Sequence, residues 1–268
     1  MERELARGGA GRVFQARDQA GEPVAIKILH PELVVSVTAE RFLREIGLLS
    51  RLDHPLITKV IDYGERDWLV YYAMPLVEGP TLRNHLDNQR YASIDDTLRI
   101  ASDLLSSLGY AHEHGIMHRD VKPENVVLSP QGAVLLDFGI ARAIEVAGTE
   151  RLTRSGFTVG TSSYMSPEQV SALPSVDTRS DIYSLGCLLY ECLAGKPPFY
   201  HRNESVVLQL QLTAPQPDIR LQRPETPAPL AEAIFRAMAQ EPDARWQSAG
   251  EMRDRVMEAA APNRTDHP

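Results

Sequence analysis

Two acidic residues, a lysine and a carboxamide lie where they could act on a phosphate group. Asp120, Lys122 and Asn125 fall within the stretch 118–125, directly before an apolar run, and Asp137 follows a second apolar run twelve residues after Asn125. An amide oxygen and a carboxylate brought together are hard ligands that suit Mg²⁺ bridging phosphates. Each stretch also has a plainer interpretation, since loop charges are often only solvated and an acid before Phe-Gly can be a simple turn.

A glycine-rich turn near the amino terminus is a second candidate for phosphate binding. Gly8, Gly9 and Gly11 would let backbone N–H groups approach phosphate oxygens, although such a turn between strands is more often only a turn. The pattern fits neither the Walker A loop nor the dinucleotide-binding turn. Lys27 lies in an apolar strand, where a lone lysine usually points to solvent. A functional role would need a carboxylate partner, for which Glu45 on the following helix is the candidate.

The elements that must position these residues change in character along the chain. Alternating apolar residues predict strands in the first part, and apolar residues at helical spacing predict one main helix there. After a turn at 78–80 the pattern becomes helical, and five prolines between 215 and 229 mark an irregular connection. The expected elements are strands at 24–28 and 68–73 and helices at 38–52, 94–114, 181–193, 230–239 and 248–259.

The composition argues against several classes of protein. The 268 residues carry 28 Lys and Arg against 36 Asp and Glu, and this net charge of −8 disfavours nucleic acid or an anionic membrane surface as the main partner. The two cysteines, Cys187 and Cys192, cannot build a disulfide framework. No apolar run approaches the roughly 18 residues of a membrane span, and the first residues do not read as a signal peptide. We therefore expect a cytoplasmic globular protein.

Taken together and in order, these segments resemble the eukaryotic-type (Hanks-type) protein kinases, especially the bacterial serine/threonine branch. The resemblance covers about residues 5–256 and implies an α+β, bilobal kinase-like fold. It divides residues 1–261 into a small β-rich lobe with one main helix (1–74), a hinge (75–79) and a larger helical lobe (80–261), before a polar tail (262–268). The matching segments are a glycine loop at 6–13, a lysine motif at 24–27, the helix glutamate Glu45, a catalytic loop at 118–125, Asp137-Phe138-Gly139 and Ser166-Pro167-Glu168.

The resemblance implies ATP as the nucleotide and Mg²⁺ as the metal, with Mn²⁺ as a substitute. Asp120 would accept or orient the substrate hydroxyl, and Lys122 would neutralise the phosphoryl group in flight. Asn125, also a catalytic-loop residue, would hold the metal together with Asp137. Thr161 would support Asp120 and Lys122. The implied partners are proteins that present Ser or Thr hydroxyls.

The resemblance also implies how the nucleotide is held. Lys27 would grip the α- and β-phosphates and would itself be oriented by Glu45. Pro75 has no N–H, but the family's hinge needs only a carbonyl at that position and an N–H at Val77. Met74 would gate the space behind the adenine, although it could equally be a core filler. The complete set of implied nucleotide-binding residues is Leu5, Gly8, Gly9, Gly11, Val13, Ala25, Lys27, Glu45, Met74, Pro75, Val77 and Val127.

The segment between Asp137 and Glu168 is long enough to be functional. Phosphorylation there would order it through charge-assisted hydrogen bonds, for which self-association would allow reaction in trans. In the larger lobe, the resemblance implies that Glu168 pairs with Arg245 and that Asp181 anchors the catalytic loop. The candidate phosphorylation sites are Thr153, Ser155, Thr158 and Thr161.

Two other functions compete with an active kinase. A pseudokinase or scaffold would bind nucleotide without efficient transfer, and Ala6 in place of a glycine together with a shortened first strand keeps this alternative open. Retention of Lys27, Glu45, Asp120, Asn125 and Asp137 favours the enzyme. A small-molecule phosphotransferase is disfavoured because the activation segment is complete and ends in Ser-Pro-Glu.

Overall fold

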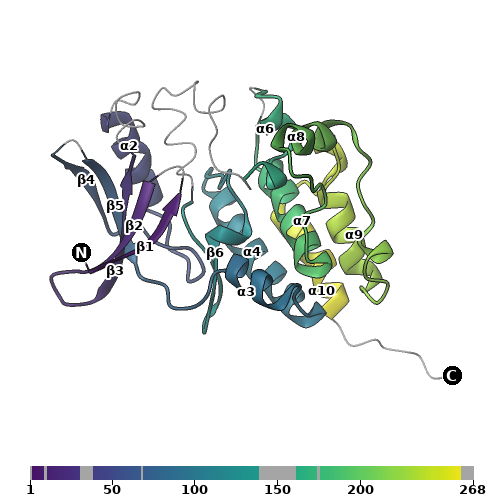
Figure 1. Cartoon of the computed structure of the whole chain (residues 1–268), viewed down its shortest axis with the longest axis horizontal. Coiled ribbons are helices and arrows are strands. Elements are labelled where there is room, and N and C mark those ends of the chain that lie inside the picture. The colour runs from purple at the N-terminus through teal and green to yellow at the C-terminus, as the bar shows by residue number, and fades with distance from the viewer. Residues whose placement is uncertain are drawn as a thin grey trace.

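Among the residues that the structure describes, the amino-terminal lobe holds a five-stranded antiparallel sheet and one helix (Figure 1). The computed structural model describes residues 2–8, 11–30, 39–67, 69–138, 161–173 and 176–260. The strands follow the order β1-β2-β3-β5-β4, and the helix α2 packs against β4. The bounds are β1 (Arg3–Gly8), β2 (Gly11–Arg17), β3 (Pro23–Leu29), α2 (Ala39–Leu49), β4 (Asp62–Arg66) and β5 (Leu69–Pro75).

The register of β3 against β5 sets which side chains of the two strands meet. In β3, Val24 and Ala25 are buried, and β3 pairs with β5 so that Ala25 lies opposite Met74. Side chains of paired residues share one face of a sheet, so register decides which residues meet. The first strand, which the sequence predicted to be short, spans six residues and pairs with β2 around one irregularity between Glu4 and Ala6.

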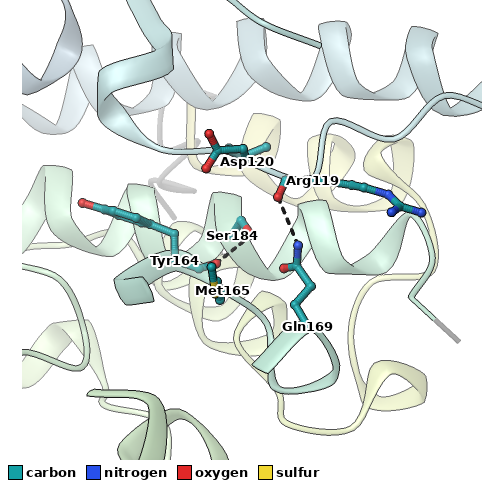
Figure 2. Close-up of a pocket in the computed structure, with 7 residues that line it drawn as sticks. Arg119, Asp120, Tyr164, Met165, Gln169 and Ser184 are labelled. Carbon is teal, nitrogen blue, oxygen red and sulfur yellow. Dashed lines mark hydrogen bonds between the residues drawn. The ribbon is translucent and has the colours of Figure 1, made fainter. Parts of the chain in front are cut away.

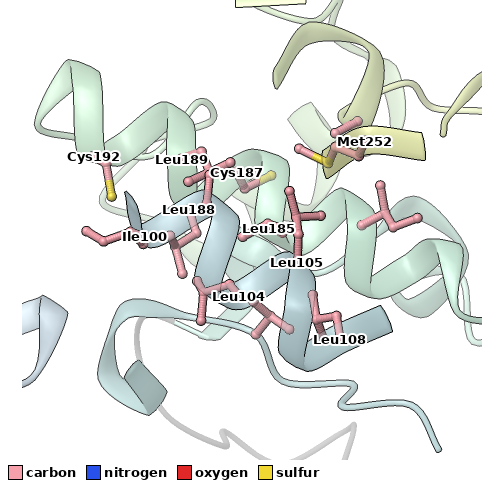
Figure 3. Close-up of a cluster of buried hydrophobic side chains, with 14 of the residues drawn as sticks. Ile100, Leu104, Leu105, Leu108, Leu185, Cys187, Leu188, Leu189, Cys192 and Met252 are labelled. Atoms are coloured by element: carbon pink, nitrogen blue, oxygen red, sulfur yellow. The ribbon is translucent and has the colours of Figure 1, made fainter. Parts of the chain in front are cut away.

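The carboxy-terminal lobe is helical, and α4 (Ile94–Glu113) and α7 (Arg179–Ala194) form its centre (Figure 3). The helix α4 begins where the Ser93 side chain accepts a hydrogen bond from the Asp96 N–H, and α7 ends at Gly195, whose left-handed backbone suits glycine. Every side chain from Ser180 to Leu193 is buried, as the sequence predicted for a helix surrounded by core. The expected helices at 94–114, 181–193, 230–239 and 248–259 are therefore confirmed, within a few residues at each end.

The remaining elements complete this lobe. In the described part of this lobe, a two-stranded hairpin and four short 3₁₀ turns lie among the helices, and α10 packs on both α4 and α9. Among the described residues, no helix is both long enough and apolar enough to cross a membrane. The bounds are α3 (Leu82–Gln89), α4 (Ile94–Glu113), η1 (Pro123–Asn125), β6 (Val126–Ser129), β7 (Gly132–Leu135), η2 (Thr161–Tyr164), α6 (Pro167–Val170), α7 (Arg179–Ala194), α8 (Glu204–Thr213), η3 (Ile219–Leu221), α9 (Ala228–Ala237), η4 (Pro242–Ala244) and α10 (Ala249–Ala260).

A segment between α2 and β4 packs with the carboxy-terminal lobe although it precedes β5, the last strand of the amino-terminal sheet along the chain. Leu52 and Ile57 belong to the same hydrophobic core as α4 and α7. The Leu135 N–H donates to the Leu56 carbonyl at 2.9 Å, and the Thr58 N–H donates to the Leu135 carbonyl at 3.2 Å. Residues 52–58 therefore act as an additional edge of the β6–β7 hairpin and join the two lobes.

Candidate active site

The β6–β7 hairpin brings two of the predicted site residues to one end. Val126 pairs with Leu135, so Asn125 lies just before the first strand and Asp137 just after the second. The Leu136 N–H donates to the Asn125 carbonyl at 2.8 Å and closes this end of the hairpin. Residues twelve apart in sequence thus become neighbours, because a two-stranded hairpin returns the chain to its starting point.

Asp120 lies at the centre of a compact cluster in the catalytic loop. Its carboxylate Oδ2 lies 2.7 Å from the Lys122 Nζ and accepts a hydrogen bond from the Asn125 Nδ2 at 3.0 Å. The same Nδ2 donates to the Asp120 carbonyl at 2.8 Å. About 29% of the Asp120 side chain is exposed, so a substrate hydroxyl could reach the carboxylate. The three residues predicted as catalytic therefore contact one another.

Lys27 reaches from the amino-terminal sheet to Asp137. Its Nζ lies 2.5 Å from the Asp137 Oδ2, and both side chains are largely buried. Among the described residues, the ion pair of Lys27 is thus with Asp137 and not with Glu45, the partner that the resemblance implied. A buried carboxylate requires a cation at close range. Asp137 meets that need with a lysine from the other lobe.

The second oxygen of Asp137 is held by Tyr72, a residue that the sequence analysis missed. The Tyr72 hydroxyl donates to the Asp137 Oδ1 at 2.6 Å. Burial alone would raise the pKa of Asp137, but the charge and hydrogen bond of Lys27 and the hydrogen bond of Tyr72 outweigh burial and lower it. Asp137 is therefore an ionised carboxylate. The available signal was strand alternation, because Tyr72 is two residues from Met74 and shares its face.

The donor set fits a divalent cation of the hard kind. Among the described residues, both hydrogen bonds of the Asn125 side chain use its Nδ2, which leaves the carbonyl Oδ1 as the amide atom able to coordinate a metal. Asp137 adds an ionised carboxylate at the same end of the hairpin. Oxygen donors of this type are those that Mg²⁺ prefers. These two residues would hold the metal if it binds here.

The backbone of the catalytic loop is anchored by Asp181, near the start of α7. The Asp181 Oδ2 accepts from the His118 N–H at 2.8 Å, and its Oδ1 accepts from the Arg119 N–H at 2.7 Å. Burial would raise the pKa of Asp181, but the His112 side chain, 2.8 Å from Oδ2, and the backbone N–H of His118 lower it. The anchoring role predicted for Asp181 is confirmed. It matters because Arg119 has a left-handed backbone with φ of 67°, which needs such support.

The end of the activation segment also contacts the catalytic loop (Figure 2). The Gln169 Nε2 donates to the Arg119 carbonyl at 3.0 Å, beside a small pocket that Asp120 helps to line. The neighbouring Glu168 forms the predicted ion pair with Arg245, with N–O distances of 2.7 and 2.8 Å. Sequence reasoning found the ion pair through the family resemblance and did not find Gln169.

A second charged network links the same region to α3. Arg83 lies 2.9 Å from both the Glu124 and the Glu191 carboxylates, and it donates to the Tyr164 hydroxyl at 2.6 Å. Tyr164 in turn donates to Glu191. One guanidinium thus connects the catalytic loop, the end of the activation segment and the core helix α7. The sequence analysis did not identify this cluster.

Of the residues predicted to surround the adenine, Val13, Ala25 and Met74 lie on adjoining strands of the amino-terminal sheet, and Val127 lies on β6 of the separate hairpin. Ala25, Met74 and Val127 are buried, and Val13 is partly buried against the amino-terminal core. Val13 pairs with Lys27 across β2 and β3. Pro75 ends β5 opposite Val24 and is exposed, as is Leu5 in β1, while Val77 is half-buried. The remaining predicted residues of the glycine loop that are described, Gly8 and Gly11, end β1 and begin β2.

Several predicted residues lie outside the described part of the chain. They are Gly9 of the glycine loop and the candidate phosphorylation sites Thr153, Ser155 and Thr158, and the side chain of Thr161 is likewise not described. Their expected roles stay predictions.

Comparison with known proteins agrees with this geometry. Residues 1–253 match the sequence family described as the protein kinase domain. The serine/threonine-protein kinase PknB of Mycolicibacterium smegmatis is 39% identical over 270 residues, which cover 97% of this chain and 43% of that protein. The probable serine/threonine-protein kinase SCO3848 of Streptomyces coelicolor is 39% identical over 258 residues, covering 93% of this chain and 38% of that protein.

A third relative is the serine/threonine-protein kinase PknH of Mycobacterium bovis. It is 37% identical over 270 residues, which cover 100% of this chain and 45% of that protein. The chain therefore spans less than half the length of the curated relatives that it matches.

Proposed function

Since this chain belongs to the protein kinase domain family, we propose that it transfers the γ-phosphoryl group of ATP to Ser and Thr hydroxyls of proteins. The observation that carries the proposal is the meeting of Lys27, Asp120, Asn125 and Asp137 around one end of the β6–β7 hairpin. Three relatives of this chain are named serine/threonine-protein kinases, which supports the choice of hydroxyl substrates.

In the proposed reaction, the chain's own groups position the reactants and balance charge. Asp120 receives the hydrogen bond of the substrate hydroxyl and takes its proton as the hydroxyl oxygen bonds to the γ-phosphorus. The bond from that phosphorus to the β–γ bridging oxygen breaks in the same step, and ADP leaves. Lys122, 2.7 Å from that carboxylate, offers its positive charge to the phosphoryl group. Lys27 binds the α- and β-phosphates. A bound Mg²⁺, or Mn²⁺ in its place, would neutralise charge on the phosphates, and Asn125 with Asp137 would hold it.

Phosphorylation in the activation segment, at one of Thr153, Ser155, Thr158 or Thr161, is part of the proposal, as is self-association for reaction in trans. We also propose that residues 75–79 form the hinge between the two lobes. The proposed site of action is the cytoplasm, where ATP is supplied. Substrates and partners of the longer relatives carry over only as the class of protein hydroxyls.

Phosphoryl transfer from Mg·ATP to a protein substrate tests the proposal, with Asp120→Asn as the control. We expect transfer by the wild-type protein and loss of about 10²-fold or more of the rate in the variant, because general-base groups typically contribute that much. Asp120→Asn is close to isosteric, so nucleotide-induced thermal stabilisation should be kept in the variant. Stabilisation of the wild-type protein by nucleotide without any transfer would instead identify a pseudokinase.

A further inference from the structure

Tyr72 lies where a tyrosine can act on the carboxylate of Asp137, and the strand register explains why. Tyr72 in β5 is the direct partner of Lys27 in β3, so the two side chains share one face of the sheet. The Lys27 Nζ lies 5.9 Å from the centre of the Tyr72 ring. Both side chains end on the same carboxylate, with the ammonium at Oδ2 and the hydroxyl at Oδ1.

The Lys27 ammonium can move away from the Asp137 carboxylate more easily than the Tyr72 hydroxyl can. Tyr72 is 1% exposed and belongs to the hydrophobic core of the amino-terminal lobe, so its ring is held by packing. Lys27 is a flexible chain that carries the charge which the phosphates of a nucleotide would attract. Departure of Lys27 from Oδ2 would still leave Oδ1 bound, because the Tyr72 hydroxyl donates to the other oxygen of the carboxylate.

We propose that Tyr72 is a positioning residue that fixes the Asp137 carboxylate through Oδ1, so that the carboxylate would keep its orientation when Lys27 turns to the phosphates and Asp137 holds a metal. This inference rests on the proposed function, because it assigns Asp137 to the metal. Donors that orient a coordinating carboxylate tune metal affinity, and their loss typically weakens metal binding by about 10- to 100-fold. Tyr72 would thus set how strongly Mg²⁺ supports nucleotide binding.

The test compares nucleotide affinity with and without metal. The dissociation constant of the non-hydrolysable ATP analogue AMP-PNP is measured by calorimetry in excess Mg²⁺ and in EDTA, for the wild-type protein and for Tyr72→Phe. Phe keeps the ring and removes only the hydroxyl. We expect the affinity in Mg²⁺ to fall by roughly tenfold and the affinity in EDTA to stay the same.

The matched control is Tyr71→Phe, one residue earlier in β5. Tyr71 donates its hydroxyl to the Asp62 carboxylate at 3.2 Å, at an exposed position. This change removes the same group from the same strand, and it should alter neither dissociation constant. A general loss of packing in Tyr72→Phe would weaken both arms of its titration equally, and that result would overturn the proposal. Tighter binding in Mg²⁺ would also overturn it, since the hydroxyl would then oppose the metal.

A second variant links the effect to Asp137 itself. In an Asp137→Ala background, Tyr72→Phe should change neither constant, and a tenfold effect that persists there would refute the assignment. The failure of the broader proposal looks different. If Mg²⁺ gives the wild-type protein no gain in AMP-PNP affinity, the metal site fails. If the gain is present and equal in wild type and Tyr72→Phe, only the role of Tyr72 fails.

Discussion

Substitution of either partner of the buried ion pair between Glu168 and Arg245 should strongly lower the free energy of unfolding of the carboxy-terminal lobe. The Arg245 side chain has no exposed surface and donates five hydrogen bonds, two to Glu168 and three to backbone carbonyls. Removing one partner of such a pair leaves a buried charge without compensation and costs about 3–5 kcal/mol. We expect Arg245→Met to lower the free energy of unfolding by about that amount.

Glu168→Gln should cost less than Arg245→Met. The glutamine can still accept one hydrogen bond, and the guanidinium keeps its three carbonyl partners. The double variant should be more stable than the sum of the single changes predicts, because it leaves no lone buried charge. Urea unfolding followed by circular dichroism measures all four proteins. Costs below about 1 kcal/mol for both single variants, or strict additivity, would refute the reasoning.

The same pair predicts a pH dependence. Burial would raise the pKa of Glu168, but Arg245 and the Ser180 hydroxyl outweigh burial and lower it. A group whose pKa is lower in the folded protein stabilises the fold above its unfolded pKa, and that stability is lost as the pH falls through the folded value. The cost of Glu168→Gln should therefore be full near pH 7 and shrink below about pH 4. A cost that grew on acidification would contradict the assignment.

Two further predictions concern glycines and thiols. Gly11→Ala should destabilise the amino-terminal lobe, because a Cβ there would lie 2.1 Å from a carbonyl oxygen of β3, whereas Gly8→Ala meets no atom within 4 Å and should leave the melting temperature unchanged. Equal melting temperatures for the two variants would exclude this steric explanation. Cys187 and Cys192 are both fully buried, and burial raises the pKa of each thiol, so neither should react with a thiol reagent until the protein unfolds. Rapid labelling of either cysteine in the native protein would show that α7 is accessible.

Much of the fold could be predicted because the signals are local. The apolar spacing of α4 and the nearly unbroken apolar content of α7 predict these helices, and both are present. The catalytic loop could be assembled from sequence alone because Asp120, Lys122 and Asn125 lie within six residues of one another. Residues so close in sequence are brought into contact by the local conformation of one loop.

The contacts that were missed depend on elements far apart in the chain. Lys27 and Asp137 are separated by 110 positions, and the choice between Asp137 and Glu45 depends on how the lobes are placed. Tyr72 could be linked to Asp137 only after the pairing of β5 with β3 was known. Gln169 reaches a backbone carbonyl 50 positions away, and no side-chain pattern marks a carbonyl. The periodicity of apolar residues within one element does not predict any of these long-range contacts.

The segment 52–58 has a consequence for attempts to divide the protein. It contributes Leu52 and Ile57 to the core that surrounds α4 and α7, and its backbone completes one edge of the β6–β7 hairpin. A chain cut at residues 75–79 would therefore separate the segment 52–58 from the hairpin and the core that it completes. The second fragment would expose the hairpin edge and Leu135, so split-protein reporters made from this domain need a break before residue 52 rather than at the hinge.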